Sequence, residues 1–209
     1  MNLLEIFEKL YSFYGPQHWW PGDSPFEVAV GAILTQNTNW TNVEKAINNL
    51  KASKALNPKK LMDMPIERLA ILIRPAGYFN IKAKRLKAFI SFLMDNYGGN
   101  MERMRKDNAK SLRRKLLLIN GIGPETADSI LLYALNKPVF VIDAYTRRIL
   151  SRHRIMDYKA SYDEYQRLFH EELDEDISLF NEYHALFVRL GKEFCKPKPR
   201  CNSCPLNQY

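Results

Sequence analysis

The sequence predicts an all-α protein. Apolar residues recur at spacings of three and four almost throughout the 209-residue chain, as they do in helices that bury one face. The apolar run at residues 139–142 is short and solitary, and a single strand cannot build a sheet. Turn signals such as Gly15-Pro16 separate the helical stretches at short intervals. We therefore expect helices joined by short turns and no sheet.

The N-terminal part predicts a buried helix that follows an amphipathic one. Residues 2–14 place apolar side chains at helical spacing and end at Gly15-Pro16. From Pro25 to about Thr35 the chain is apolar on nearly every side, which predicts a buried central helix. Ser24 is its expected N-cap, with Glu27 as the capping-box partner. Further helices are expected over residues 43–52, 58–64, 66–73, 82–96, 112–119, 124–135, 144–153, 161–172 and 177–193.

Composition and charge narrow the class of partner. The formal net charge of +8 and the sequence pI near 9.3 favour a polyanion. No apolar run approaches the roughly 20 residues that span a bilayer, so no membrane partner is expected. The first residues carry Glu5 and Glu8 and lack the basic start of a signal peptide. The three cysteines all follow residue 194 and make no disulfide scaffold, so we expect a reducing, cytoplasmic location.

The stretch from Leu116 to Arg148 is the one around which the chain is organised. A helical run breaks at Asn120-Gly121-Ile122-Gly123, and Pro124 can then start a second helix, where its missing N–H costs nothing. The two glycines can adopt positive φ and turn backbone N–H groups outward beside a helix N-terminus. Such a helix–hairpin–helix offers a phosphate-sized anion site that needs no side chain. Taken alone, Gly-x-Gly before a helix is also an ordinary turn.

A single carboxylate follows the hairpin. The apolar run at residues 139–142 delivers Asp143 to the start of another helix, where an Asp taken alone is an N-cap. In combination, the hairpin and this Asp resemble the helix–hairpin–helix/Gly-Pro-Asp superfamily of DNA base-excision glycosylases, the endonuclease III-like group. The resemblance extends from about Ser24 to the C-terminus.

The resemblance implies a fold and a role for several residues. The fold would be two-lobed and of the endonuclease III type, with a C-terminal cysteine loop. Residues 25–138 would form a central domain, with the hairpin at about 112–135, and residues 1–24 plus 139–209 would form the second lobe. Asp143 would be catalytic, in a cleft between the lobes. The DNA backbone would be bound by Asn120, Gly121, Ile122, Gly123, Thr126 and the Lys137-Pro138 segment.

Two loops carry further candidate residues. Trp19, Trp20 and Pro21 stand together in one loop, which either packs on the core or forms a stacking platform for a base. A Trp-Trp-Pro segment here is similar to the base-contacting loop of the 3-methyladenine glycosylase III branch, and Trp40 is expected to join it. Gln36, otherwise part of an exposed polar loop, matches the family's intercalating residue. Its amide can donate to and accept from the base left unpaired by flipping.

The C-terminal tail carries three candidate metal ligands. Cys201 and Cys204 have the Cys-x2-Cys spacing of zinc and iron–sulfur sites, and Cys195 precedes them. The family pattern, Cys-x6-Cys-x2-Cys-x5-Cys, implies a [4Fe–4S] cluster. Here the first gap is five residues and the fourth Cys would fall at position 210, so a non-Cys ligand, a longer chain, zinc or an empty site remain open. The basic residues of this loop are expected to face phosphate, namely Lys196, Lys198 and Arg200.

The expected reaction is hydrolysis of the N-glycosidic bond of a flipped base. Bond cleavage develops positive charge on the sugar, and an ionised carboxylate such as Asp143 can stabilise it and orient water. Bifunctional family members place a Lys in the hairpin motif, where this chain has Glu125. A carboxylate cannot form a Schiff base. We therefore expect a monofunctional DNA glycosylase without AP-lyase activity.

The substrate is inferred from one missing acid. The adenine-mismatch branch protonates its base with a Glu at the position of Gly31. An alkylated purine such as 3-methyladenine or 7-methylguanine already carries positive charge and would be attracted to tryptophan ring faces. Thymine or uracil from a mismatch is the alternative, and a non-catalytic hairpin DNA-binding protein is an alternative of another class. The expected partner is duplex DNA with a damaged base in the nucleoid, bound by a monomer.

Overall fold

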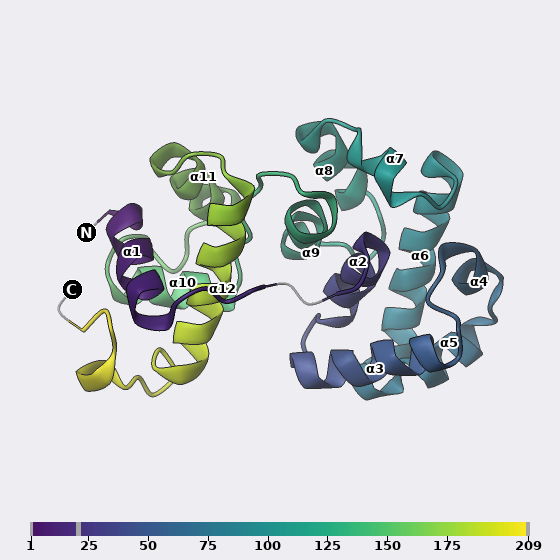
Figure 1. Ribbon diagram of the computed structural model, residues 1–209, viewed down its shortest axis with the longest axis horizontal. Helices are drawn as coiled ribbons and strands as arrows, with labels where there is room; N and C mark the ends of the chain where they lie inside the picture. The colour runs from purple at the N-terminus through teal and green to yellow at the C-terminus, as the bar shows by residue number, and fades with distance from the viewer. Residues whose placement is uncertain (1, 20–21, 208–209) are drawn as a thin grey trace. The chain divides into compact units, whose positions relative to one another are not determined.

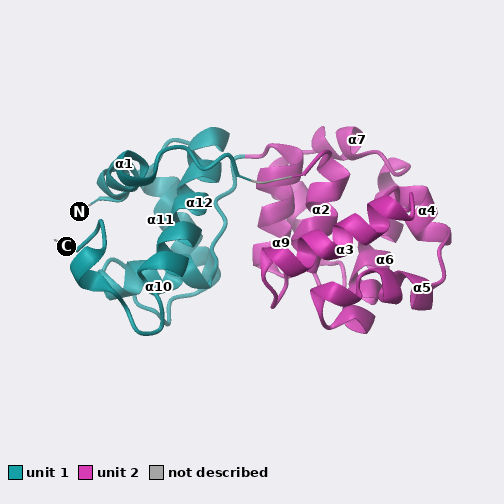
Figure 2. Ribbon diagram, turned by 60° about the horizontal axis from the view of Figure 1, so that its bottom comes forward, with its two compact units in different colours: residues 1–20, 138–209 teal, residues 21–137 magenta. Residues whose placement is uncertain are grey.

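The computed structural model describes residues 2–19 and 22–207 and is all-helical, as predicted (Figure 1). Within these ranges the chain forms no strand. It divides into two compact units, which Figure 2 distinguishes by colour. Unit 1 comprises residues 1–20 and 138–209, and unit 2 comprises residues 21–137. No helix in the described ranges is long and apolar enough to cross a membrane.

Unit 2 is built around α2 (Pro25–Leu34), which is buried at every position after Pro25. Ser24 caps this helix by accepting from the backbone N–H of Glu27, as the sequence predicts. The predicted capping box does not form, and the Glu27 carboxylate instead pairs with Lys51 Nζ at 2.6 Å. The elements packed on α2 are α3, α6, α9 and the π-helix η2. The helices of the unit that follow α2 are α3 (Trp40–Ala52), α4 (Pro58–Asp63), α5 (Ile66–Leu72), η1 (Arg74–Ala76), α6 (Phe79–Tyr97), α7 (Met101–Arg105), α8 (Ala109–Leu117), α9 (Pro124–Ser129) and η2 (Ile130–Ala134).

The helix after the hairpin departs from the regular one expected over residues 124–135. α9 passes directly into η2, a π-helical turn of the kind that appears as a local bulge in α-helices. Asn136 then takes a positive φ of 50° and ends the helix, and the N–H of Lys137 donates to the carbonyl of Leu131 at 2.9 Å. All five residues of η2 are buried, so packing and not local sequence selects the wider turn.

Unit 1 packs four helices around an aromatic core. Phe140 stacks on Phe169 with ring centroids 3.6 Å apart, and Tyr183 and Phe187 close the cluster at the same site. All four side chains are almost fully buried. The helices are α1 (Leu3–Tyr14), α10 (Ala144–Arg152), α11 (Tyr162–Glu172) and α12 (Ile177–Glu193), followed by the short 3-10 helix η3 (Cys201–Ser203).

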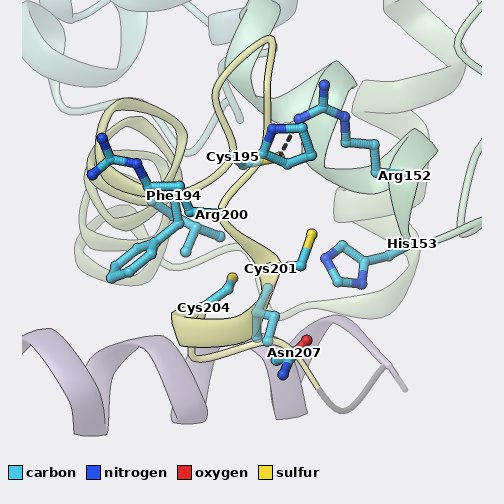
Figure 3. A pocket seen from close by; sticks show the side chains of 11 residues that line it. Arg152, His153, Phe194, Cys195, Arg200, Cys201, Cys204 and Asn207 are labelled. Carbon is cyan, nitrogen blue, oxygen red and sulfur yellow. Dashed lines mark hydrogen bonds between the residues drawn. The ribbon is translucent and has the colours of Figure 1, made fainter.

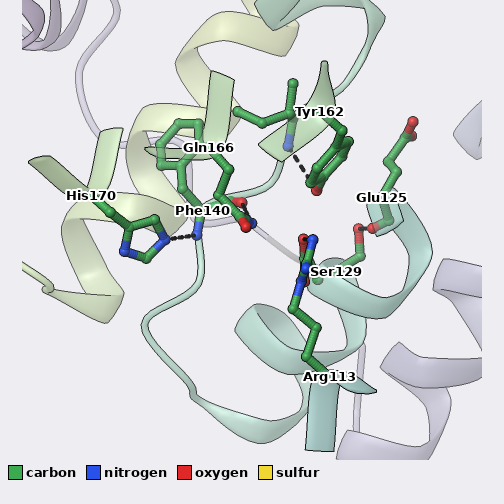
Figure 4. Close-up of polar contacts among 9 residues, drawn as sticks. Arg113, Glu125, Ser129, Phe140, Tyr162, Gln166 and His170 are labelled. Carbon is green, nitrogen blue, oxygen red and sulfur yellow. Dashed lines mark hydrogen bonds and ion pairs between the residues drawn. The ribbon is translucent and has the colours of Figure 1, made fainter. Parts of the chain in front are cut away.

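The apolar run before Asp143 is extended but belongs to no sheet, and side chains of α11 form hydrogen bonds with its backbone instead. The N–H of Phe140 donates to His170 Nε2 at 3.3 Å, and the N–H of Ile142 donates to Tyr162 Oη at 3.2 Å (Figure 4). Gln166 Nε2 donates to the carbonyl of Phe140 at 2.7 Å. A buried backbone group without a partner is costly, so these bonds let a lone extended segment run through the core. They fix the point at which Asp143 enters α10.

Candidate functional site

Asp143 is the N-cap of α10, the structural role that its sequence position predicts. Its Oδ1 accepts from the backbone N–H of Thr146 at 2.7 Å and from the Thr146 hydroxyl at 2.9 Å. Its Oδ2 lies 3.6 Å from Nε2 of His184 on α12. Asp143 is 9% exposed and His184 is 4% exposed. The two carboxylate oxygens therefore face different partners in a buried site.

The surroundings of Asp143 favour its ionised form. Burial raises the pKa of this carboxyl group, but the neighbouring His184 and the bonds from Thr146 lower it by more, so the pKa is below its ordinary value. The 3.6 Å separation between Asp143 Oδ2 and His184 Nε2 is longer than a normal hydrogen bond. The site thus presents an anion at neutral pH in surroundings that screen it little.

The hairpin between α8 and α9 has the positive-φ glycine expected at position 121, but the same expectation for position 123 is wrong. Gly121 takes a φ of +84°, whereas Gly123 is extended and caps α9. Asn120 and Gly123 are exposed, Gly121 is half-buried and Ile122 is buried. Two of the four turn residues, Asn120 and Gly123, are therefore exposed to solvent.

Gln36 and the hairpin are joined by a polar network inside unit 2. Gln36 Nε2 donates to the carbonyl of Gly121 at 3.0 Å and to the hydroxyl of Thr126 at 2.9 Å. Arg85 on α6 donates through Nη1 to Oε1 of Gln36. Thr126, a predicted DNA contact, is 7% exposed and holds Gln36 in this structure. The structure thus brings together two predicted DNA-contacting elements that are 85 residues apart in the chain.

A buried lysine also holds the start of the loop that carries Gln36. Lys82 on α6 donates through Nζ to the carbonyls of Leu34 at 2.8 Å and Ala76 at 2.7 Å. Its side chain is 1% exposed, and burial together with the nearby Arg85 lowers its pKa to about 8. An ammonium group on the last carbonyls of a helix favours that helix end. Lys82 therefore fixes the point at which the chain leaves α2.

The predicted aromatic residues are distributed over both units. Trp19 lies in unit 1, half-buried, with the Lys192 ammonium 5.9 Å from its ring centroid. Trp40 is the first residue of α3 in unit 2 and is also half-buried. The predicted base-contacting residues Trp20 and Pro21 lie outside the described residues. The Lys192 contact indicates that the Trp19 ring can face a cation.

The three cysteines share one cavity of about 120 Å³ in unit 1 (Figure 3). Cys195 is buried, Cys204 is half-buried and Cys201 is exposed, and none forms a disulfide. Burial, and then the charges of the other two thiols, raise the pKa of Cys204. His153 and Arg200 line the same cavity. Among the described residues, no three His, Cys, Asp or Glu side chains are arranged to hold a single metal ion.

Arginine side chains from α10 hold the start of the cysteine loop. Arg148 Nε donates to the carbonyl of Cys195 at 2.6 Å, and Arg152 donates to the Cys195 sulfur at 3.3 Å. Arg152 also donates to the carbonyls of residues 196 and 197 at 2.6 and 3.0 Å. Of the predicted phosphate-facing residues, Lys198 and Arg200 are exposed and Lys196 is half-buried. The loop therefore brings three thiols and several basic side chains together in one segment.

Two residues of the site were not predicted from the sequence. His184 looks like one more polar residue in an amphipathic helix, and nothing local marks it as a neighbour of Asp143. Arg85 belongs to a cluster of basic residues at the start of α6, and from the sequence alone such a cluster indicates a solvent-exposed helix face. One feature of the sequence does indicate a role for this cluster: positive charge at a helix N-terminus opposes the helix dipole and is therefore unusual.

Comparison with known proteins places these features in a family. A model of the HhH-GPD superfamily base excision DNA repair protein matches residues 30–175. A Methanocaldococcus jannaschii protein, named as a candidate DNA repair glycosylase, is 49% identical over 209 residues, which cover 99% of this chain and 94% of that protein.

Two solved structures resemble the chain along most of its length. An H. pylori 3-methyladenine DNA glycosylase bound to 1,N6-ethenoadenine superposes with a TM-score of 0.82 at 29% identity, covering 92% of this chain and 98% of the other. A non-covalent endonuclease III–DNA complex gives a TM-score of 0.84 at 21% identity, covering 99% and 92%. The fold is therefore the endonuclease III-like one.

The hairpin geometry predicts unequal effects for its two glycines. An alanine Cβ at position 121 would lie 2.6 Å from Nε and 2.7 Å from Cδ of Arg85 and would sit on a backbone with positive φ. Gly121→Ala should therefore lower the free energy of unfolding by about 1 kcal/mol or more. Gly123→Ala meets no atom within 4 Å and should change it by less than about 0.5 kcal/mol. Urea denaturation measures both, and equal losses would contradict the described turn.

Proposed function

Because the chain belongs to the HhH-GPD superfamily of base excision DNA repair proteins, we propose that it is a DNA glycosylase that hydrolyses the N-glycosidic bond of a damaged base. The observation that carries this proposal is the buried, ionised carboxylate of Asp143 at the start of α10. Enzymes that act on a stacked base first flip its nucleotide out of the duplex.

The proposed chemistry follows from charge. As the base departs, positive charge develops on the sugar, and the Asp143 carboxylate stabilises it electrostatically. Oδ1 is held by two donors from Thr146, which leaves Oδ2 as the oxygen better able to meet the sugar or the attacking water. In this proposal the hairpin N–H groups bind backbone phosphate and Gln36 fills the place of the flipped base.

Lesion excision should depend on the charge of Asp143. Asp143→Asn keeps a side chain that can still cap α10 but removes the anion, so single-turnover base release should fall by about 10²-fold or more. Affinity for lesion duplex should stay within a few-fold of wild type. The matched control is Asp176→Asn at the N-cap of α12 in the same unit, where Asp176 accepts from the N–H of Leu179 at 2.6 Å. Similar losses in both variants would reduce Asp143 to a helix cap.

We further propose that the enzyme is monofunctional. Glu125 occupies the position of the family's lysine nucleophile, and in this structure it is exposed in the first turn of α9, where the helix dipole favours an acid. Water is then the attacking group, and the product is an intact strand with an abasic site. No covalent intermediate forms between the protein and DNA.

Borohydride reduction tests the absence of a Schiff base. Wild-type protein should give no trapped protein–DNA adduct, and strand breaks should appear only after alkali or heat. Glu125→Lys supplies an amine at this position and serves as the comparison for detectable trapping. Efficient trapping of the wild-type protein at neutral pH would show that another amine, with Lys137 the first suspect, forms the imine.

We propose an alkylated purine as the substrate. The position of the adenine-specific acid is Gly31, which is buried within α2 and can supply no proton to a neutral purine. A cationic base needs none, and it gains from ring-face attraction to tryptophan, roughly 0.5–2 kcal/mol per contact. The 29% identity to the H. pylori 3-methyladenine DNA glycosylase supports this choice. Mismatched thymine or uracil remains the alternative.

A panel of duplexes that each hold one lesion tests the choice. Release of 3-methyladenine or 7-methylguanine should exceed release of hypoxanthine, thymine or uracil by at least about tenfold. Trp19→Leu should reduce release of the cationic bases more than that of neutral ones. Phe13→Leu, an exposed aromatic elsewhere in unit 1, is the control and should change neither. Preference for thymine or uracil opposite guanine would favour the alternative, and release of no base would leave only DNA binding.

We propose that the cysteine loop binds a [4Fe–4S] cluster through Cys195, Cys201 and Cys204. The donors fit, because three thiols that form no disulfide line one cavity, together with both apolar and basic side chains. Their failure to converge on a single ion does not oppose a cluster, in which each iron takes its own protein ligand. His153 lines the same cavity and is a donor that this chain offers for the fourth position. When bound, a cluster cross-links the loop and can exchange an electron.

Chemical analysis of anaerobically purified protein tests this assignment. About four irons and four sulfides per chain are expected. Cys201→Ser should lower both contents and the visible absorbance, while Ser203→Ala in the same loop should not. One zinc per chain, or no metal at all, would replace the cluster in this account.

A further inference from the structure

His184 faces the Asp143 carboxylate but has no role in the reaction described so far. It lies in the middle of α12, in a segment where positions 183–188 are all buried. Its Nε2 is 3.6 Å from Asp143 Oδ2, and its ring meets the edge or face of Phe140 at a centroid distance of 6.5 Å. A polar ring in this position costs more to bury than an apolar one, which raises the question of what it does.

The chemistry of the contact assigns the hydrogen of the imidazole. An unprotonated Nε2 would point a lone pair at an anion in a buried site, which is repulsive. Nε2 therefore carries a hydrogen in either the neutral or the charged ring, directed at Oδ2. Two neutral donors of Thr146 bind Oδ1, so the two oxygens have separate partners. His184 is the partner of Oδ2.

The other titratable groups near this segment have different tasks. On α11, Tyr162 and His170 accept from the backbone N–H groups of Ile142 and Phe140. On α10, Thr146 is not titratable, and Arg147 and Arg148 donate to the carbonyls of Ala160 and Cys195. On α12, the neighbouring Tyr183 donates to the carbonyl of Leu3 at 2.8 Å. His184 is thus the titratable side chain that these packed elements direct at Asp143.

We propose that His184 is a positioning residue for base excision, which fixes the orientation of Oδ2 and keeps the Asp143 carboxylate ionised as positive charge develops on the sugar. This inference rests on the proposed function, because it assigns a task to a neighbour of the proposed catalytic group. It predicts that the His184 contribution is largest where Asp143 is closest to protonation. The sign follows from the site. Without the imidazole, burial raises the pKa of Asp143 with less opposition, so activity is lost at a higher pH on the acid side.

The experiment is the pH profile of single-turnover base release. His184→Leu removes the donor, and its acid limb should move to higher pH by about one unit or more, with a deficit of at least about tenfold at low pH. The deficit should narrow as pH rises. His184→Gln keeps an N–H donor and should lie between Leu and wild type. Tyr183→Phe, which loses a buried hydrogen bond from the same helix, should keep the wild-type profile shape.

A direct titration separates this inference from the function on which it rests. The Asp143 carboxyl carbon is followed by ¹³C NMR in wild type and both His184 variants, with Asp143→Asn assigning the signal. A higher pKa in the variants supports the inference even if wild-type protein releases no base, an outcome that defeats only the proposed function. An unchanged carboxyl pKa, or an equal rate loss at every pH, would overturn the role of His184. Should His184→Leu fail to fold, His184→Gln carries both measurements.

Discussion

The burial of one carboxylate is the constraint on which unit 1 depends. An ionised group in a core must be met by donors or charge, or it takes up a proton. Asp143 meets this need locally through Thr146 on α10 and at a distance through His184 on α12. Its position in turn requires the extended segment before it, whose backbone bonds to side chains of α11. Two helices, α10 and α12, therefore contact the carboxylate, and α11 holds the segment that leads to it.

Unit 2 also has to satisfy polar groups beside a buried element, and it does so with a polar network at the end of α2. α2 is buried along its length, so the chain that leaves it must satisfy its carbonyls and turn sharply. Lys82 donates to the carbonyl of Leu34. Gln36 then forms hydrogen bonds with Gly121, Thr126 and Arg85. Because the partners come from α6 and from the hairpin, loop and hairpin hold each other. Movement of Gln36 into DNA would have to break these bonds, which links the two proposed DNA-contacting elements energetically.

The sequence predicts what local patterns determine. Helical spacing gave the all-α fold, apolar surroundings gave the burial of α2, and cap and turn chemistry gave Ser24 and the Gly121 turn. Tertiary contacts decided the rest. The π-turn of η2 depends on packing, Lys82 looks like a surface lysine until its carbonyl partners are known, and His184 is 41 residues from the Asp143 it faces. The spacing of Cys195, Cys201 and Cys204 predicted that they act together, and in the structure they line one cavity.

The central claim is that the Asp143 carboxylate acts on the sugar of a flipped nucleotide in a duplex whose backbone the hairpin binds. A crystal structure of the Asp143→Asn protein on a lesion-containing duplex tests it most directly. The account predicts that C1′ of the flipped nucleotide lies beside the side chain at position 143, that a phosphate accepts from backbone N–H groups near Gly123, and that Gln36 has left Thr126 for the vacated stack. A duplex bound without a flipped nucleotide, or with its sugar remote from position 143, would contradict it.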